Sequence, residues 1–239
     1  MKSFSITDVG KERTVNQDYI YCEDNPIGNL PNLFIVADGM GGHKAGDFAS
    51  RFCVDTVTKQ IKESKRKTPV GILEDAIKTA NEELLSKAEE QSELDGMGTT
   101  LVVATIFNDT MYVANIGDSR LYVINSEIKQ ITEDHSLVEE MIKTGELPRK
   151  EARFHPNKNV ITRAVGSNKY VSPDYFEVSL KQGDTILMCS DGLSNMMDDE
   201  EIMDIVNEYS EIELIGNKLI ERANGYGGKD NIAIILIRE

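Results

Sequence analysis

The chain has 239 residues and a formal net charge of −15, because 41 Asp and Glu outnumber 26 Lys and Arg. This length suits one large domain or two small ones, with enough buried core to fold without disulfides. The acidic balance argues against a nucleic-acid-binding protein and against an electrostatic membrane anchor, since both need basic side chains facing phosphate groups.

The cysteines and the N-terminus predict a cytoplasmic protein. The three cysteines, Cys22, Cys53 and Cys189, cannot all pair within one chain and form no C-x-x-C motif. A small number of cysteines that are not paired in disulfides is typical of proteins in a reducing compartment. The N-terminal residues lack the apolar segment of a signal peptide. The longest apolar runs are far shorter than the roughly 20 residues that span a bilayer.

The first predicted elements are a strand and two helices. Residues 33–37 form an apolar run that is typical of a β-strand. Two long helical patterns follow between residues 43 and 95, and in the second Thr68 can cap the helix with Pro69 at its first position. Apolar side chains at helical spacing predict the buried face of this second helix. They are Leu73, Ala76, Ile77, Ala80, Leu84 and Ala88.

Three further strands are predicted at residues 101–107, 111–116 and 121–124. Short turns at Asn108-Asp109 and Asn125-Ser126 favour an antiparallel meander through this part of the chain. Several of the runs are apolar at successive positions, which is typical of strands that are buried on both faces.

The middle of the chain is predicted to hold one helix and one irregular insert. Ser136 and Glu139 form a capping box that starts the helix. Its predicted buried side consists of Leu137, Val138, Met141 and Ile142. The segment from about residue 145 to 166, called the flap below, is the least regular part of the chain. We interpret it as a surface insert on a single domain spanning residues 1–239, and such inserts often carry function.

The last predicted elements are two strands with two helices between them. The strands are residues 185–189 and 232–237. Asp198 with Glu201 starts one helix, and an apolar stripe at residues 212, 215, 219 and 223 predicts the other. The element order shows no regular βαβ alternation, which disfavours a parallel doubly wound fold. A mostly antiparallel core covered by helix pairs fits better.

Five aspartates stand where strands meet turns: Asp18, Asp38, Asp118, Asp191 and Asp230. Two of them are followed by glycine, and Arg13 lies five residues before the first. A single Asp-Gly pair is ordinary turn chemistry. Carboxylates that converge at one sheet edge, however, repel each other unless cations bridge them. Hard ions such as Mg²⁺ and Mn²⁺ prefer oxygen ligands, so the pattern favours a metal site.

Other phosphate-handling motifs are absent. The dinucleotide fingerprint G-x-G-x-x-G would need glycine at position 44, which is Lys44. No P-loop and no G-x-S-x-G elbow occurs. No cysteine is followed by arginine six positions later, which excludes the thiolate-based phosphatase signature.

The ordered set of motifs resembles the metal-dependent serine/threonine protein phosphatases of the PPM type, also called the PP2C family. The matching pieces are R-x-x-N-Q-D (13–18), D-G-M-G-G-H (38–43), G-T-T (98–100), G-D-S-R (117–120), S-D-G (190–192) and D-N (230–231). Each piece is weak alone, but together they cover residues 13–231 in family order. The D-G-M-G-G-H form is similar to that of the compact bacterial branch.

The resemblance implies an α+β fold, a four-layer α-β-β-α sandwich in which helix pairs flank two mostly antiparallel sheets. It also implies two Mn²⁺ or Mg²⁺ ions as cofactors. The implied metal ligands are Asp18, Asp38, Gly39, Asp118, Asp191 and Asp230. Bacterial members often hold a third ion at the residues that match Asp118 and Asp191.

The resemblance also implies individual roles for these ligands. Asp38 would bridge the two ions, and the Gly39 carbonyl would bind one of them. Asp191 and Asp230 would hold the first ion. Asp18 would act through coordinated water.

Arg13 would grip the substrate phosphate. The resemblance departs at Met40, where many eukaryotic members carry the histidine that is proposed as general acid. Methionine cannot donate a proton, which leaves His43, His155 or a coordinated water as alternatives. His155 would then also contact substrate, although it could equally be a plain surface residue of the flap.

The implied activity is hydrolysis of phosphoserine and phosphothreonine in proteins by a metal-bridging hydroxide, with no covalent phosphoenzyme. The implied partners are phosphorylated proteins, including a Ser/Thr kinase that the enzyme opposes, and we expect a monomer. Two other classes stay open. One is a catalytically inactive relative that acts as a binding module. The other is a calcium-binding β protein, although the EF-hand pattern is absent and Arg13 would then have no role.

The charge is unevenly distributed along the chain. Residues 143–169 contain seven basic and two acidic residues, although the whole chain is strongly acidic. This cluster could be a chance feature of a loop. Alternatively, the flap offers a local basic field to phosphorylated substrates.

Overall fold

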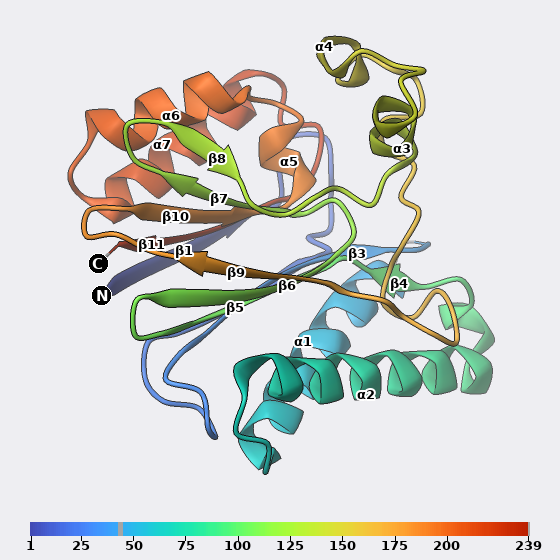
Figure 1. Cartoon of the computed structure of the whole chain (residues 1–239). Helices are drawn as coiled ribbons and strands as arrows, with labels where there is room; N and C mark the ends of the chain where they lie inside the picture. The colour runs from blue at the N-terminus through green and yellow to red at the C-terminus, as the bar shows by residue number, and fades with distance from the viewer. Residues whose placement is uncertain (43–44, 239) are drawn as a thin grey trace.

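The computed structural model describes residues 1–42 and 45–238. Its elements form four layers, in which two β-sheets lie face to face and helices cover both outer sides (Figure 1). The paired strands are antiparallel. The α-β-β-α sandwich implied by the family resemblance is therefore confirmed, as is the mostly antiparallel core predicted from the element order.

The first sheet has five strands in the order β1-β11-β10-β7-β8. Their bounds are β1 (Lys2–Asp8), β7 (Arg120–Ile124), β8 (Ile128–Gln130), β10 (Thr185–Cys189) and β11 (Ile232–Arg238). The second sheet has the order β2-β3-β5-β6-β9, and β4 pairs with β3. Its strands are β2 (Asp18–Glu23), β3 (Leu33–Met40), β4 (Gly98–Thr99), β5 (Leu101–Phe107), β6 (Thr110–Ile116) and β9 (Asp174–Ser179).

Two helix pairs cover the sheets. The pair α1 (Ala45–Glu63) and α2 (Pro69–Glu90) packs on the second sheet, and α6 (Asp199–Glu208) and α7 (Ile212–Gly225) pack on the first. The short helices are the 3₁₀-helix η1 (Ser92–Leu94), α3 (Leu137–Lys143), α4 (Arg149–Ala152) and α5 (Asp191–Ser194). None of the described helices combines the length and apolar content that a membrane crossing requires.

The central strands are buried on both faces, as their continuous apolar runs predict. In β3, Leu33 and Ile35 face α1 and α2, whereas Phe34 and Val36 lie between the sheets. The same alternation in β11 divides its side chains between the core under α6 and α7 and the core between the sheets. Successive side chains of a strand point to opposite faces, so a strand in the middle of four layers needs apolar residues at every position.

The predicted meander is only partly correct. The turn at Asn108 and Asp109 joins β5 to β6 in one sheet, but β7 pairs with β8 and β10 in the other sheet. The chain changes sheets at residues 117–119, where Gly117 has a φ of 102°. Glycine adopts this conformation without the steric penalty of a Cβ atom. The crossing is fixed by a hydrogen bond between Ser119 Oγ and Thr100 Oγ1 (2.8 Å).

The helix α3 begins as predicted but buries less than predicted. Ser136 Oγ accepts from the Glu139 N–H group at 3.3 Å. Of the four apolar side chains assigned to its buried side, only Val138 is buried, and the other three are half-buried. The reason is that α3 and α4 stand outside the sandwich, next to its first sheet (Figure 1), where no layer covers them. The prediction of a buried face is therefore wrong for Leu137, Met141 and Ile142.

Candidate metal centre

The five aspartates come from both sheets and lie at one end of the sandwich. Asp18 begins β2 and stands opposite Asp38 in the register of β2 and β3. Asp191 begins α5 directly after β10, and Asp230 lies two residues before β11. Asp118 lies in the crossing between the sheets. The strand pairings thus bring together carboxylates that are up to 212 positions apart in the sequence.

The cluster is electrostatically strained without cations. Burial, reinforced by the charges of Asp191 and Asp230, raises the pKa of Asp18 to about 8. Burial and the surrounding aspartates raise the pKa of Asp38 well above its usual range. Burial, followed by the charge of Asp230, raises the pKa of Asp191 to about 6. These directions identify a group of carboxylates that repel one another when they are all ionised.

Three buried carboxylate oxygens in the cluster have no hydrogen-bond partner among the residues that the structure describes. They are the Oδ1 atoms of Asp18, Asp118 and Asp191. A buried polar atom without a partner is costly, and a divalent cation with oxygen ligands removes that cost. The described residues contain no three Asp, Glu, His or Cys side chains already spaced around an ion. The cluster fits a metal ion because its ligand atoms are carboxylate oxygens and because three of these oxygens have no other partner among the described residues.

Hydroxyl side chains that the sequence analysis did not single out hold the aspartates in place. The Asp38 N–H group donates to Thr100 Oγ1 (2.9 Å), and Thr99 Oγ1 donates to the Asp38 carbonyl (2.9 Å). Ser190 Oγ donates to Asp18 Oδ2 at 2.6 Å. Their positions within the G-T-T and S-D-G motifs were the available signal. The two threonines thus hold the backbone of Asp38, and Ser190 leaves only Oδ1 of Asp18 free for a cation.

Gly39 lies where only glycine fits. Its N–H group donates to the Gln17 carbonyl (3.0 Å). A Cβ atom at this position would collide with the Gly46 carbonyl oxygen near the start of α1. The backbone of β3 therefore passes directly against α1, next to Asp38.

Replacing Gly39 with Ala is expected to displace α1 or β3 and to lower the free energy of unfolding by about 1–3 kcal/mol, the usual range for an overpacked site. Urea unfolding followed by circular dichroism measures this change. Gly225→Ala is the matched control, because a Cβ atom at Gly225 has no neighbour within 4 Å. Equal stability of the two variants would contradict the close packing at Gly39.

Arg13 lies at the edge of the aspartate cluster. Its side chain is 47% exposed, and Nη2 forms an ion pair with Asp230 Oδ2 at 2.8 Å. Asn231 holds the loop before β2 by donating to the carbonyls of Val9 (2.9 Å) and Val15 (3.0 Å). The structure therefore places the guanidinium beside a candidate ligand, within reach of solvent.

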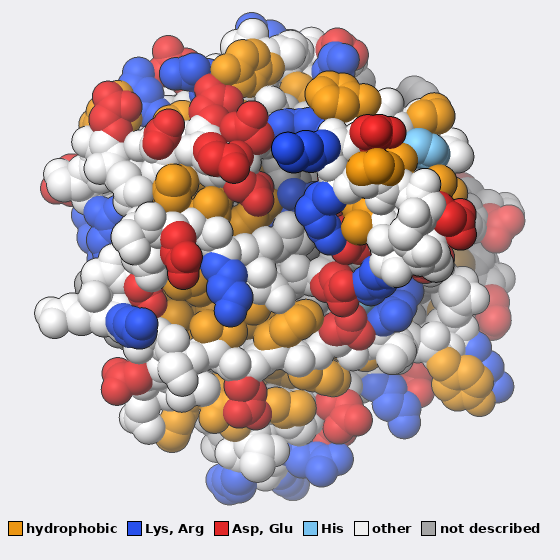
Figure 2. Space-filling view, turned by 45° about the horizontal axis from the view of Figure 1, so that its top comes forward, with side chains coloured by type: hydrophobic (Ala, Val, Ile, Leu, Met, Phe, Trp, Pro, Cys, Tyr) orange, Lys and Arg blue, Asp and Glu red, His pale blue; other side chains and the backbone are white. Residues whose placement is uncertain are grey.

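A groove of about 550 Å³ runs between the flap and the sandwich. Asp118 and Asp191 line it on the sandwich side, and Arg149, Arg153 and Phe154 line it on the flap side. Figure 2 shows the face on which α3 and α4 come forward, where basic and hydrophobic side chains gather above and to the right of the centre. The carboxylates thus open onto a surface large enough for a peptide segment.

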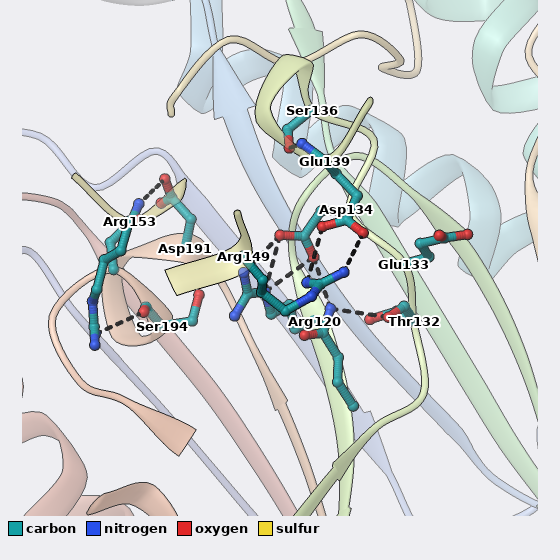
Figure 3. A network of polar contacts seen from close by, with 12 residues as sticks. Arg120, Thr132, Glu133, Asp134, Ser136, Glu139, Arg149, Arg153, Asp191 and Ser194 are labelled. Atoms are coloured by element: carbon teal, nitrogen blue, oxygen red, sulfur yellow. Dashed lines mark hydrogen bonds and ion pairs between the residues drawn. The ribbon is translucent and has the colours of Figure 1, made fainter. Parts of the chain in front are cut away.

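More than half of the basic residues of segment 143–169 are paired with nearby acidic residues. Four of its seven basic side chains form ion pairs: Lys143 with Glu133, Arg149 with Glu139, Arg153 with Asp198, and Arg163 with Asp174. Figure 3 shows Arg149 reaching Glu139 and Arg153 reaching Ser194. These contacts weigh against a free basic field over the flap and indicate that its arginines anchor it.

The histidines occupy different environments. His43 lies outside the described residues. The Nδ1 atom of His155 accepts from the Asn157 N–H group at 3.2 Å, and His155 is not among the described residues that line the groove. His135 is buried, and its Nδ1 atom accepts from the Gly117 N–H group (3.1 Å). His155 thus lies outside the described lining of the groove, whereas His135 supports the crossing between the sheets.

A family model described as protein phosphatase 2C matches residues 10–221 of the chain. The chain belongs to the protein phosphatase 2C family. The serine/threonine phosphatase stp of Listeria welshimeri is 40% identical over 236 residues, which cover 97% of this chain and 93% of that protein. The crystal structure of Stp1 from Staphylococcus aureus has a TM-score of 0.93 and 38% identity, covering 100% of this chain and 94% of that one.

Another solved relative of this PP2C phosphatase contains metal. The catalytic domain of the serine/threonine protein phosphatase PstP, in complex with two manganese ions, has a TM-score of 0.86 and 30% identity, covering 98% of this chain and 96% of that one. The resemblance stated from the sequence motifs is thus confirmed. The protein is a serine/threonine protein phosphatase of a metal-dependent family and acts on phosphoproteins.

Proposed function

We propose that this phosphatase holds two Mn²⁺ or Mg²⁺ ions at its aspartate cluster and at the Gly39 carbonyl, and that Asp118 and Asp191 provide for a third. The observation that carries the proposal is the set of buried carboxylate oxygens without partners on Asp18, Asp118 and Asp191. Bound divalent cations lower the pKa of water and neutralise charge on a transferring phosphoryl group.

The proposed roles of the individual ligands follow from their neighbours. Burial and the charges of all four other aspartates raise the pKa of Asp38, so it is the carboxylate best placed to be shared between ions. One carboxylate oxygen of Asp18 accepts from Ser190 and the other is free, which suits a residue that contacts a metal ion through a coordinated water. Asp230 presents one oxygen to Arg13 and accepts from the Asn231 N–H group with the other (2.9 Å).

Arg13 is the proposed phosphate-binding residue. A guanidinium presents a planar fork of donors that matches two phosphate oxygens. Its ion pair with Asp230 keeps the fork at the cluster before substrate arrives. When the substrate binds, its phosphate would accept hydrogen bonds from guanidinium N–H groups that Arg13 now directs at the Asp230 carboxylate.

We further propose that the phosphoryl group passes directly to water. Burial raises the pKa of Cys53 and of Cys189 to about 12, so both remain thiols at neutral pH and are poor nucleophiles. Met40 has no proton to donate to the departing Ser or Thr oxygen. For that proton, His43 stays a sequence-based prediction, with coordinated water as the alternative.

At the level of the cell, we propose a cytoplasmic, monomeric enzyme that removes phosphate from the targets of a Ser/Thr kinase and from the kinase itself. The support is the relatives, which are serine/threonine phosphatases. We also propose that residues 1–239 form one catalytic domain with a flap at about 145–166, because a shared core joins the two sheets.

Replacing Arg13 with Ala is expected to lower kcat/KM for a phosphothreonine peptide about 10–100-fold in the presence of Mn²⁺. Hydrogen bonds to charged groups contribute about 1.5–3 kcal/mol, and each 1.36 kcal/mol is a factor of ten in rate. The assay is phosphate release from the peptide, with hydrolysis of a chromogenic phosphate ester in parallel.

Arg66→Ala is the matched control for this experiment. Arg66 forms an exposed ion pair with Asp75 at 2.8 Å, the same distance as that between Arg13 and Asp230, but it lies far from the cluster at the start of α2. This control should keep the kcat/KM of the unaltered protein. A folded Arg13→Ala variant with unchanged kcat/KM would remove Arg13 from the proposed mechanism.

A further inference from the structure

The flap exposes a large aromatic side chain beside the catalytic groove. The chain has only seven phenylalanines, and one of them, Phe154, is 84% exposed. It lines the same groove as Asp118 and Asp191. A ring of this size normally contributes to a core, so its exposure at this place needs a physical reason.

The exposure does not result from a loose backbone. The Phe154 N–H group donates to the Glu151 carbonyl (3.0 Å), which closes the turn after α4. The preceding Arg153 donates to the carbonyl of Ser194 (3.2 Å), the last residue of α5. Since α5 begins at Asp191, this bond ties the position of Phe154 to a candidate metal ligand.

A second contact holds the other end of α4. Arg149 donates to both carboxylate oxygens of Glu139, with distances of 2.6 and 3.1 Å (Figure 3). Glu139 belongs to α3 and is buried. The short helix that precedes Phe154 is thus fastened to α3 at its start and to α5 just after its end. The backbone that carries Phe154 is thereby positioned in advance, which reduces the entropy lost when this segment contacts a ligand.

The groove next to Phe154 has an apolar wall. Its apolar lining residues outside the sandwich are Val138, Ile142, Ala152 and Phe154. Ile142 is half-buried, because no layer covers this side of α3. Apolar patches with polar surroundings on soluble proteins mark binding sites. This wall belongs to the same groove as Asp118 and Asp191. Its occupant is therefore the substrate segment that carries the phosphorylated Ser or Thr to these aspartates.

We propose that Phe154 is a specificity-determining residue of this phosphatase. Together with Ile142 it forms a subsite for one large apolar side chain, such as Leu or Met, close in sequence to the phosphorylated Ser or Thr of the substrate. This inference rests on the proposed function. It adds a preference for apolar neighbours to an activity that otherwise recognises the phosphate.

The test uses phosphopeptides that differ at one position. A host peptide of three glycines, phosphothreonine and three glycines is compared with versions that carry a single Leu or a single Ser at each flanking position. We expect kcat/KM with Mn²⁺ to favour Leu over Ser about tenfold at one or more positions, the range for a small apolar contact. In Phe154→Ala that ratio should fall below about twofold, and Phe154→Leu should keep most of it.

Tyr170→Ala is the matched control. Tyr170 is also 84% exposed and lies on the return segment from the flap, but it faces a different pocket, beside α2. This variant should keep the Leu preference of the unaltered protein. Equal rates for all Leu and Ser peptides, or a preference that survives in Phe154→Ala, would overturn the inference and leave the phosphatase function intact. Failure to hydrolyse any of the peptides, the host included, would overturn the proposed function and this subsite with it.

Discussion

Replacing Asp38 with Asn is expected to lower kcat about 10³-fold or more while the protein stays folded. The charges of the four other aspartates all act on Asp38, so its loss should disturb each of the proposed ions. Metal ions supply several kcal/mol of transition-state stabilisation, and each 1.36 kcal/mol is a factor of ten in rate. Phosphate release from a phosphothreonine peptide at saturating Mn²⁺ measures the loss.

The fold of this variant should not suffer, because the substitution removes one of several charges that repel each other. The melting temperature of the metal-free variant is expected to equal or exceed that of the unaltered metal-free protein. Asp204→Asn is the control, since Asp204 is an exposed residue of α6, outside the cluster. A folded Asp38→Asn enzyme with normal turnover would exclude Asp38 from the reaction.

Removing divalent ions with EDTA is expected to abolish activity and to lower the melting temperature, and added Mn²⁺ should restore both. The proposed ions would neutralise a cluster in which burial and neighbouring charges raise the pKa of Asp18 and Asp38. A ligand at 100 times its Kd stabilises the folded state by about 2.7 kcal/mol. Thermal unfolding with and without Mn²⁺ measures this gain without any assay of turnover.

The stabilisation by Mn²⁺ should shrink in Asp38→Asn and persist in Asp204→Asn. This comparison separates binding at the cluster from weak binding to an acidic surface. Full activity in a protein shown by elemental analysis to be free of metal would contradict the metal-dependent mechanism.

The parts of the fold that were predictable are those with a local signal. The stripe from Leu73 to Ala88 and the cap at Asp198 identify α2 and α6, because helix periodicity and capping depend on neighbouring residues. The apolar runs of β3 and β11 identify strands of the inner layers, where both faces are buried.

The elements that were missed have mixed patterns. The strands β1, β2 and β9 lie at sheet edges and are mostly half-buried, so their sequences lack a clear period. The change of sheet at Gly117 depends on contacts with Thr100, which precedes a different strand. No property of residues 117–119 alone distinguishes a sheet crossing from a hairpin.

The candidate site also has parts that the sequence predicts and parts that it does not. Four of the aspartates were identifiable because each lies beside a predicted strand and next to a motif glycine or asparagine, whereas Asp18 was identifiable only from the R-x-x-N-Q-D motif. Their hydrogen-bond partners were not, since the bond from Ser190 to Asp18 spans 172 positions. The anchoring of the flap by Arg149 and Arg153 was also out of reach, because net charge along a segment does not show which acidic residues lie opposite.

The origin of the aspartates in two different sheets has a mechanical consequence. Asp18 and Asp38 belong to one sheet, Asp191 and Asp230 flank strands of the other, and the side chains between the sheets set the distance between the two groups. Packed sheets lie about 10 Å apart. The core between the sheets therefore sets the distance between the proposed ligands of one sheet and those of the other. Residues such as Phe34 and Ile235, which lie in this core, therefore contribute to the spacing of the proposed ligands.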